Sequence, residues 1–150
     1  MFNQHWPRWI QASVTKHFVD ALSSELNVFT EGSERDTQTD KEYIEVRLDG
    51  PNVKPQPNGQ YELEVTPNIM ITTASVKDTY KHRRVMGKVL AAFENSIEIK
   101  KYGNGIDDDD SLLGCLQLKG QVRGNYFGQI DTVLRLEQAT VDAEFTITLA

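Results

Sequence analysis

The chain has 150 residues, of which 39% are apolar and 25% are charged. This composition is typical of a soluble protein that buries one core without disulfides or structural metal. The formal net charge of −6 argues against nucleic acid as a general partner, because proteins that bind nucleic acid usually present net positive surfaces. Cys115 is the only cysteine, which excludes an intramolecular disulfide and a cysteine-based zinc site.

The N-terminal residues lack the basic and apolar regions of a signal peptide. No apolar run approaches the ~18 residues that a membrane-spanning helix needs. We therefore expect a protein that is made and used in solution, in a reducing compartment.

The first predicted element is an amphipathic helix that begins at Pro7. Proline suits the first helical position because the amide hydrogen that it lacks would be unpaired there. Apolar residues then recur every four positions, at Ile10, Val14, Phe18, Leu22 and Leu26. This spacing predicts a helix that ends near Asn27. The polar segment from Thr30 to Lys41 has no periodicity and predicts a loop.

Two strands are predicted next, from the alternation of apolar and polar residues. The first covers Ile44 to Leu48 and is expected to stop at Gly50-Pro51, before a proline-rich connection that ends at Asn58-Gly59. The second covers Tyr61 to Ile71 and is expected to pair antiparallel with the first. Pro67 inside it indicates an edge position or a bulge.

A second helix is predicted after a cap at Ser75 or Asp78, and it runs to about Asn95. Its two faces differ in chemistry. One face is apolar and also carries His82, whereas the other is a basic stripe formed by Lys77, Lys81, Arg84 and Lys88. The stripe is compatible with a solvated helix face, a phosphate backbone or an acidic neighbouring subunit. The acidity of the chain favours the neighbouring subunit.

The remaining chain predicts further strands, at Ile97 to Ile99, Leu116 to Val122, Thr132 to Leu136 and Val141 to Leu149. The spacing of Gly114, Gly120, Gly124 and Gly128 indicates bulged or closely approached strands. The element order predicts an α+β fold with a largely antiparallel or mixed sheet of about five to six strands and two main helices packed on one face. We expect a single domain over residues 1–150.

No catalytic or metal-binding motif stands out. His5, His17 and His82 lie outside any metal-binding frame, and nothing provides Cys115 with a base. We therefore expect no enzyme activity, no cofactor and no metal, and a partly buried His82 with one hydrogen-bond partner. The acidic run of Asp107, Asp108, Asp109 and Asp110 is compatible with a divalent cation, but it does not match an EF-hand loop. We favour contact between this run and the basic stripe of another copy.

A further candidate contact element is the segment from Gln121 to Gln129. Its polar and aromatic residues predict a long hairpin that projects from the sheet, with contacts made by Arg123, Asn125, Tyr126 and Phe127. A loop tip with no fixed structure is the alternative for this segment.

The chain resembles the tail terminator proteins of long-tailed bacteriophages, also called tail completion or neck proteins. The resemblance lies in the segment from Tyr43 to Pro51, the strand from Tyr61 to Ile71 with its Thr72-Thr73 exit, and the closing strand around Phe145-Thr146-Ile147. The apolar helix pattern of Val85, Val89, Leu90 and Phe93 completes it.

The resemblance implies a structural virion protein that forms a homohexameric ring at the head–tail junction. Such a ring caps the tail tube protein, offers a surface to the head-completion or connector protein, and lets genome DNA pass through its lumen without specific binding. It implies assembly in the host cytoplasm and a final place in the tail or neck of the virion, without a membrane partner. The alternatives are a small α+β enzyme or ligand-binding protein with a pocket lined by Tyr80, His82 and Cys115, and another virion component such as a tube or head-completion protein.

Overall fold

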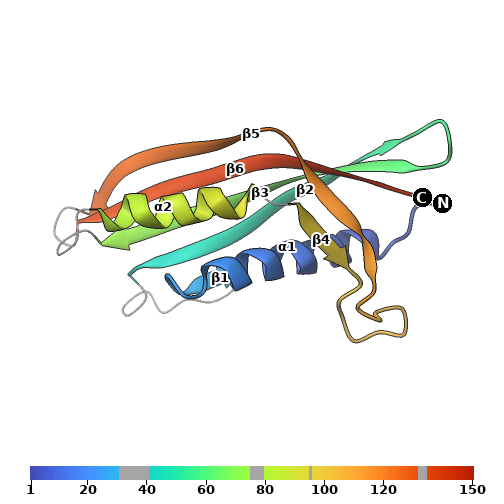
Figure 1. Cartoon of the computed structure of the whole chain (residues 1–150), viewed down its shortest axis with the longest axis horizontal. Coiled ribbons are helices and arrows are strands. Elements are labelled where there is room, and N and C mark those ends of the chain that lie inside the picture. The colour runs from blue at the N-terminus through green and yellow to red at the C-terminus, as the bar shows by residue number, and fades with distance from the viewer. Residues whose placement is uncertain (31–40, 75–79, 95, 132–134) are drawn as a thin grey trace.

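Two helices pack against one face of a six-stranded mixed sheet, which confirms the α+β prediction (Figure 1). The computed structural model describes residues 1–30, 41–74, 80–94, 96–131 and 135–150. The elements are α1 (Trp6–Leu22), β1 (Val28–Thr30), β2 (Tyr43–Pro55), β3 (Tyr61–Ala74), α2 (Lys81–Ala92), β4 (Ile97–Lys100), β5 (Leu112–Asp131) and β6 (Leu136–Leu149). The predicted loop from Thr30 to Lys41 lies almost entirely outside the described residues.

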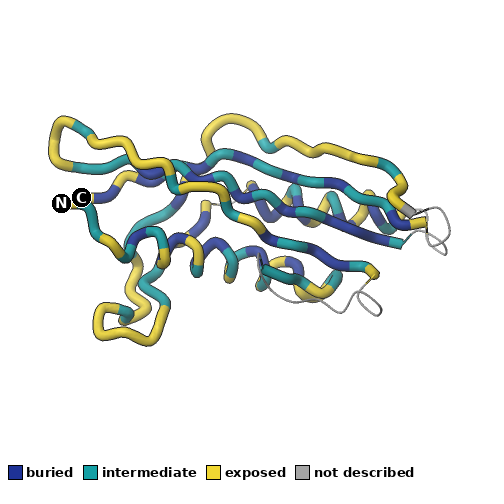
Figure 2. Tube along the Cα trace, turned by 180° about the vertical axis from the view of Figure 1, so that it is seen from behind, coloured by how far each residue is buried: buried dark blue, intermediate teal, exposed yellow. Residues whose placement is uncertain are grey.

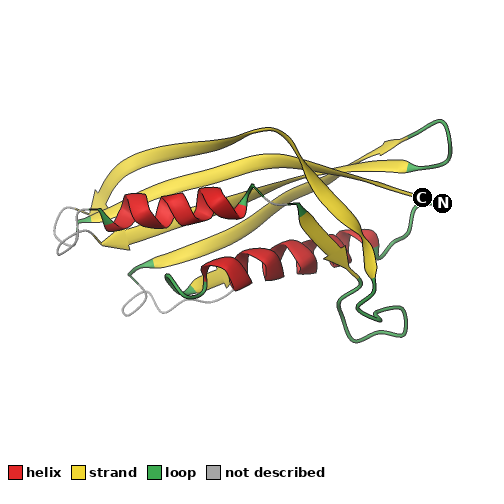
Figure 3. Ribbon diagram, viewed as in Figure 1, coloured by secondary structure: helices red, strands yellow, loops and turns green. Residues whose placement is uncertain are grey.

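The strand order is β1-β2-β3-β6-β5-β4, and every neighbouring pair is antiparallel except the short parallel pair β1–β2. Both helices lie on the same side of the sheet, and the chain termini meet at one end of its long axis (Figure 3). The other face of the sheet carries alternating polar residues. The helices therefore leave this face of the sheet uncovered, and Figure 2 shows it from behind, with buried and partly exposed residues alternating along β3 and β6.

The alternation of apolar and polar residues along β3 matches the alternation of buried and partly exposed side chains. Leu63, Val65, Ile69 and Ile71 are buried on the helix side, as predicted. The prediction of an edge position for Pro67 is wrong, because β3 lies between β2 and β6. The interior strand accommodates the proline where its pairing with β6 is interrupted, between Val65↔Phe145 and Asn68↔Asp142.

The first predicted strand is longer than expected. β2 continues through the cis Gly50–Pro51 bond to Pro55, with a shift in register between Asp49 and Asn52. Gly50 has φ +98°, and a Cβ there would lie 2.8 Å from the carbonyl oxygen of Glu64, so glycine permits the bulge. The bulge allows β2 to continue past Gly50 and Pro51. β2 and β3 are then joined by the Asn58-Gly59 turn, which a hydrogen bond from Gln56 N to Gln60 O stabilises.

The prediction of a projecting hairpin at Gln121–Gln129 is wrong. These residues belong to β5, a single strand of 20 residues that pairs first with β4 and then with β6. The register between β5 and β6 shifts three times, which confirms the bulges expected from the glycines. Gly120 and Gly128 adopt φ +87° and +84° at these shifts. The predicted strand from Thr132 lies outside the described residues up to Leu134, and Leu136 begins β6.

The helices and the sheet share one core. α1 ends at Leu22, five residues before the predicted end near Asn27, because the chain turns there through a hydrogen bond from Glu25 N to Leu22 O. α2 ends at Ala92, and its predicted caps Ser75 and Asp78 lie outside the described residues. Phe93 follows directly and joins the layers, with ring centroids 4.9 Å from Phe18 of α1 and 6.2 Å from Phe145 of β6. None of the described helices is long and apolar enough to cross a membrane.

Candidate interaction surfaces

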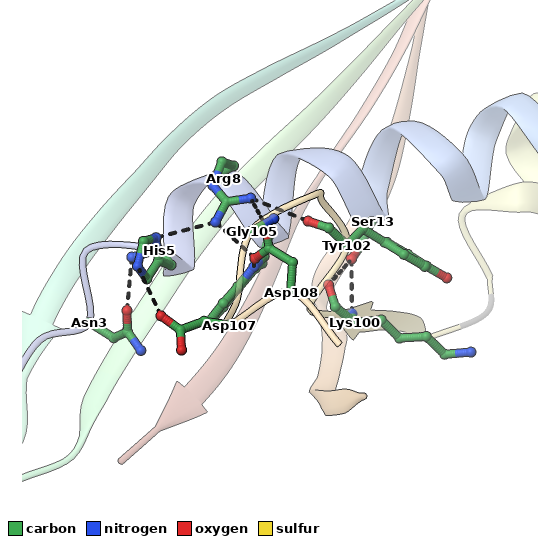
Figure 4. Close-up of polar contacts among 10 residues, drawn as sticks. Asn3, His5, Arg8, Ser13, Lys100, Tyr102, Gly105, Asp107 and Asp108 are labelled. Carbon is green, nitrogen blue, oxygen red and sulfur yellow. Dashed lines mark hydrogen bonds and ion pairs between the residues drawn. The ribbon is translucent and has the colours of Figure 1, made fainter. Parts of the chain in front are cut away.

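The acidic run lies in the connection from β4 to β5, beside the start of α1, and its central carboxylate is used within the chain (Figure 4). Asp108 accepts hydrogen bonds from Arg8 Nη1 at 2.8 Å, Arg8 Nη2 at 2.9 Å and Trp9 Nε1 at 2.7 Å. The backbone N–H of Gly105 donates a further bond at 3.0 Å. The Asp108 side chain is only 2% exposed. This corrects the prediction of Asp108 as a subunit contact, because its oxygens are already occupied.

These donors also fix the charge of Asp108. The Arg8 guanidinium, followed by the Trp9 and Gly105 N–H groups, holds the pKa of the Asp108 carboxyl far below its usual range. In return, the hydrogen bond that Arg8 donates to Asp108 raises the pKa of Arg8. Gly103, at φ +151°, lies against the same carboxylate, so that a Cβ there would overlap Asp108. We call Asp108 and its three donors, Arg8, Trp9 and the Gly105 N–H, the clamp. The clamp gives the loop one defined conformation.

The other three aspartates of the run differ in their hydrogen bonds and in their exposure to solvent. Asp109 accepts from the Ser111 side chain at 2.6 Å and from its backbone N–H at 3.1 Å, which lowers the pKa of Asp109. Asp110 has φ +59°, and its backbone N–H bonds to the carbonyl of Lys101. Asp107 is 72% exposed and lies 3.8 Å from His5 Nε2. The neighbouring Ile106 is fully exposed, so the clamp presents an apolar and an acidic side chain together.

The cation alternative gains no support from this geometry. Within the part of the chain that the structure describes, no group of three or more His, Cys, Asp or Glu residues is arranged to hold a metal ion. Asp108 and Asp109 instead accept hydrogen bonds from donors of their own loop or of α1.

The basic stripe on α2 is also partly neutralised within the chain. Lys81 donates to Glu42 at 2.7 Å, and Glu42 also accepts from the backbone N–H of Ala74. Lys88 lies 3.6 Å from Glu25, in the turn that follows α1. Lys77 lies outside the described residues. These pairs hold α2 to its neighbours, so the stripe is a weaker candidate for contact with another subunit than its sequence indicated.

A cation that the sequence analysis missed lies next to the stripe. The guanidinium of Arg83 lies 4.7 Å from the ring centroid of Tyr126, on β5. Among the described residues, no carboxylate forms an ion pair with Arg83. Helical periodicity places Arg83 off the stripe, and only the position of β5 beside α2 brings it against Tyr126.

The four contact candidates on β5 point to both sides of the sheet. Arg123 pairs with Asp142 at 3.1 Å, and Asn125 lies opposite Thr140 on the same polar face. Tyr126 instead faces α2, and Phe127 is 60% exposed. The structure therefore separates these four residues into two surfaces.

Phe127 and Ile130 owe their exposure to the irregular register of β5. Each is the extra residue where the pairing with β6 shifts, between Tyr126 and Gly128 and between Gln129 and Asp131. Bulges of this kind redirect side chains away from the alternation of a regular strand. Ile130 is 51% exposed, and it adds a second apolar side chain to this end of β5.

His82 has one hydrogen-bond partner, as expected, but it is fully buried and not partly buried, and its Nε2 has no partner among the described residues. Its Nδ1 lies 2.8 Å from Thr73 Oγ1, and its ring lies 5.4 Å from that of Tyr126. Burial lowers the pKa of His82, which favours the neutral ring. The proposed pocket of Tyr80, His82 and Cys115 does not form: Cys115 lies opposite Glu98 of β4, whereas Tyr80 is an exposed residue beside α2.

The described surface also has a polar groove of about 310 Å³ between α1 and β4, lined by Ser13, Lys16, His17, Asp20, Ser96, Glu98 and Tyr102. Lys16 pairs with Asp20 at 3.1 Å, and His17 Nε2 bonds to the carbonyl of Ala92 at 2.9 Å. Ser13 bonds to the backbone of Lys100. Most polar groups of the groove therefore already have partners within the chain.

Comparison with known proteins defines the fold and no more. No family model matches the chain, and no curated protein matches it. Among the solved structures that match is a chain whose title describes no function, with a TM-score of 0.54 at 11% identity. The match covers 96% of this chain and 95% of that chain. The class defined here is thus a small α+β domain with two helices on one face of a mixed sheet.

Proposed function

We propose that this protein is a structural subunit of a bacteriophage tail, which forms a homohexameric ring that caps the tail tube and joins it to the head connector. The observation that carries the proposal is a pair of groups among the exposed apolar side chains, which also include Val53, Tyr80 and Leu118. Ile106 and Leu112 flank the acidic loop, and Tyr126, Phe127 and Ile130 lie toward the far end of β5. These two groups lie toward opposite ends of the long axis (Figure 1). Separate exposed apolar groups at two ends suit a subunit with two neighbours.

The sheet supports the same proposal. Beyond its pairing with β4, β5 forms the edge of the described sheet, and so does β2 beyond its three pairs with β1. Open edges present unpaired backbone groups that another chain can bind, and proteins usually cover or protect them. Pro51 and Pro55 lie on the β2 edge, whereas β5 has no proline. Assembly with further copies, the tail tube protein or the head connector would cover such an edge.

The mass of the purified protein in solution tests this proposal. Light scattering coupled to size exclusion, over a range of concentrations, should give a closed oligomer of fixed mass, and negative-stain images should show rings. Antibody labelling of purified virions should then place the protein between head and tail. A mass that rises without limit would favour a tube subunit. A protein absent from virions would refute the proposal.

A further inference from the structure

We infer that the acidic loop of one copy packs against a cationic aromatic patch on the next copy, and that this contact closes the ring. The patch consists of Arg83 and Tyr126, whose side chains are in contact, and of Phe127 and Ile130, which are exposed on the same end of β5. The occupant is a second copy of this chain, through Ile106 and Asp107. The inference rests on the proposed function and names the two surfaces that would form its subunit interface.

The patch has the composition of an interface centre. It combines an arginine, a tyrosine and two exposed apolar side chains, and aromatic residues and arginine are enriched in such centres. Arg83 lies over the Tyr126 ring, 4.7 Å from its centroid, which favours one placement of its guanidinium before binding. Arg83 is an exposed residue of α2, so a partner can reach its guanidinium.

The loop has the complementary chemistry. Ile106 is fully exposed and Asp107 is 72% exposed, while the Arg8–Asp108–Trp9 clamp fixes the loop behind them. A loop that is already ordered loses less entropy on binding than a flexible one. The inferred contact therefore places Ile106 against the apolar side chains of the patch and Asp107 beside Arg83.

The positions of the two surfaces make the contact heterologous. The loop lies at one end of the molecule and the end of β5 at the other (Figure 1). The same two surfaces therefore cannot meet within one chain, and each copy offers one to each neighbour. Repeated head-to-tail contacts of this type give a ring when the rotation between copies closes. Opposite charges at the contact fix its register and disfavour patch-to-patch pairing.

Charge exchange tests the contact directly. Arg83→Glu and Asp107→Lys should each weaken self-association at least about tenfold, as measured by light scattering over a concentration series. The double variant should regain assembly, because the two exchanged side chains again carry opposite charges where neighbouring copies meet. An equimolar mixture of the two single variants should also assemble, since alternating copies restore one native and one exchanged pair. Glu94→Lys changes an exposed charge outside both surfaces and serves as the control, with circular dichroism to verify folding.

Disulfide trapping provides a second test that also detects weak association. In a Cys115→Ser background, the combination of Ile106→Cys and Phe127→Cys should give a ladder of covalent multimers under oxidising conditions, and each single cysteine no more than dimers. If the wild-type protein is oligomeric but the charge variants assemble normally and no ladder forms, this contact is refuted while the proposed function stands. If the wild-type protein is monomeric at every concentration and no ladder forms, the contact is refuted, and the labelling of virions decides the proposed function.

Discussion

Phe93 provides the sharpest test of how the layers of this fold are joined. Its ring is fully buried and contacts Phe18 of α1 and Phe145 of β6, so one side chain links both helices to the sheet. Phe93→Ala removes these contacts and leaves a cavity. Substitutions of this type cost about 3–5 kcal/mol. A domain of this size has a total stability of about 5–15 kcal/mol, so the variant should fold but be much less stable.

The assay is urea unfolding followed by tryptophan fluorescence, since Trp6 and Trp9 are both buried on α1. With a denaturant slope of about 2 kcal/mol per molar urea, the midpoint should fall by about 2 M. Protein concentration must be held constant, because the self-association that we propose would add to apparent stability. Val53→Ala, on the exposed β2–β3 hairpin, is the control and should change stability by less than about 0.5 kcal/mol. A loss below about 1 kcal/mol for Phe93→Ala would refute the role of this ring as the link between layers.

The clamp and the basic stripe yield three more predictions. Asp108→Asn should be less stable than wild type near neutral pH. Because the folded-state pKa of Asp108 lies below its ordinary value, this difference should shrink as pH falls below about 4, and urea midpoints that differ equally from pH 7 to pH 3 would contradict it. Gly103→Ala should destabilise the loop and reduce Ile106–Phe127 disulfide trapping, whereas Gly59→Ala, another glycine with positive φ but open space, should leave trapping unchanged. A double-mutant cycle on Lys81 and Glu42 should give a coupling of about 0.2–1 kcal/mol in unfolding, and Lys81→Ala should leave the oligomer mass unchanged; a dissociated oligomer would restore the stripe as a subunit contact.

Several elements were predictable because their signals are local. Alternation in β3 and the four-residue spacing in α1 depend only on the geometry of a single strand or helix. The predictions based on proline were wrong. Pro51 indicated the end of a strand and Pro67 indicated an edge position, and neither prediction holds in the structure. Pro51 lies at a bulge in the pairing of β2 with β3, and Pro67 lies where the pairing of β3 with β6 is interrupted. Both features depend on a neighbouring strand, which the local sequence does not identify.

The candidate surfaces were predicted less well, because charge patterns do not reveal which charges are already paired. The acidic run and the basic stripe were identified as mutual partners between copies. Asp108 instead bonds to Arg8, and Lys81 bonds to Glu42, both within the chain. Arg83 was overlooked because it lies on α2, whereas Tyr126, whose ring it contacts, lies on β5, far away in the sequence.

The sequence alone determined the fold class, the helix-side face of β3 and the places where glycine would permit bulges, because each depends on residues close together in the chain. The tertiary structure decided which charged groups remain available for contact. Arg8 and Asp108 are 100 positions apart, and Arg83 meets Tyr126 only because β5 runs beside α2. Pairings of this kind depend on the complete sheet order, which brings distant segments together and leaves Ile106, Asp107 and Arg83 exposed on the surface.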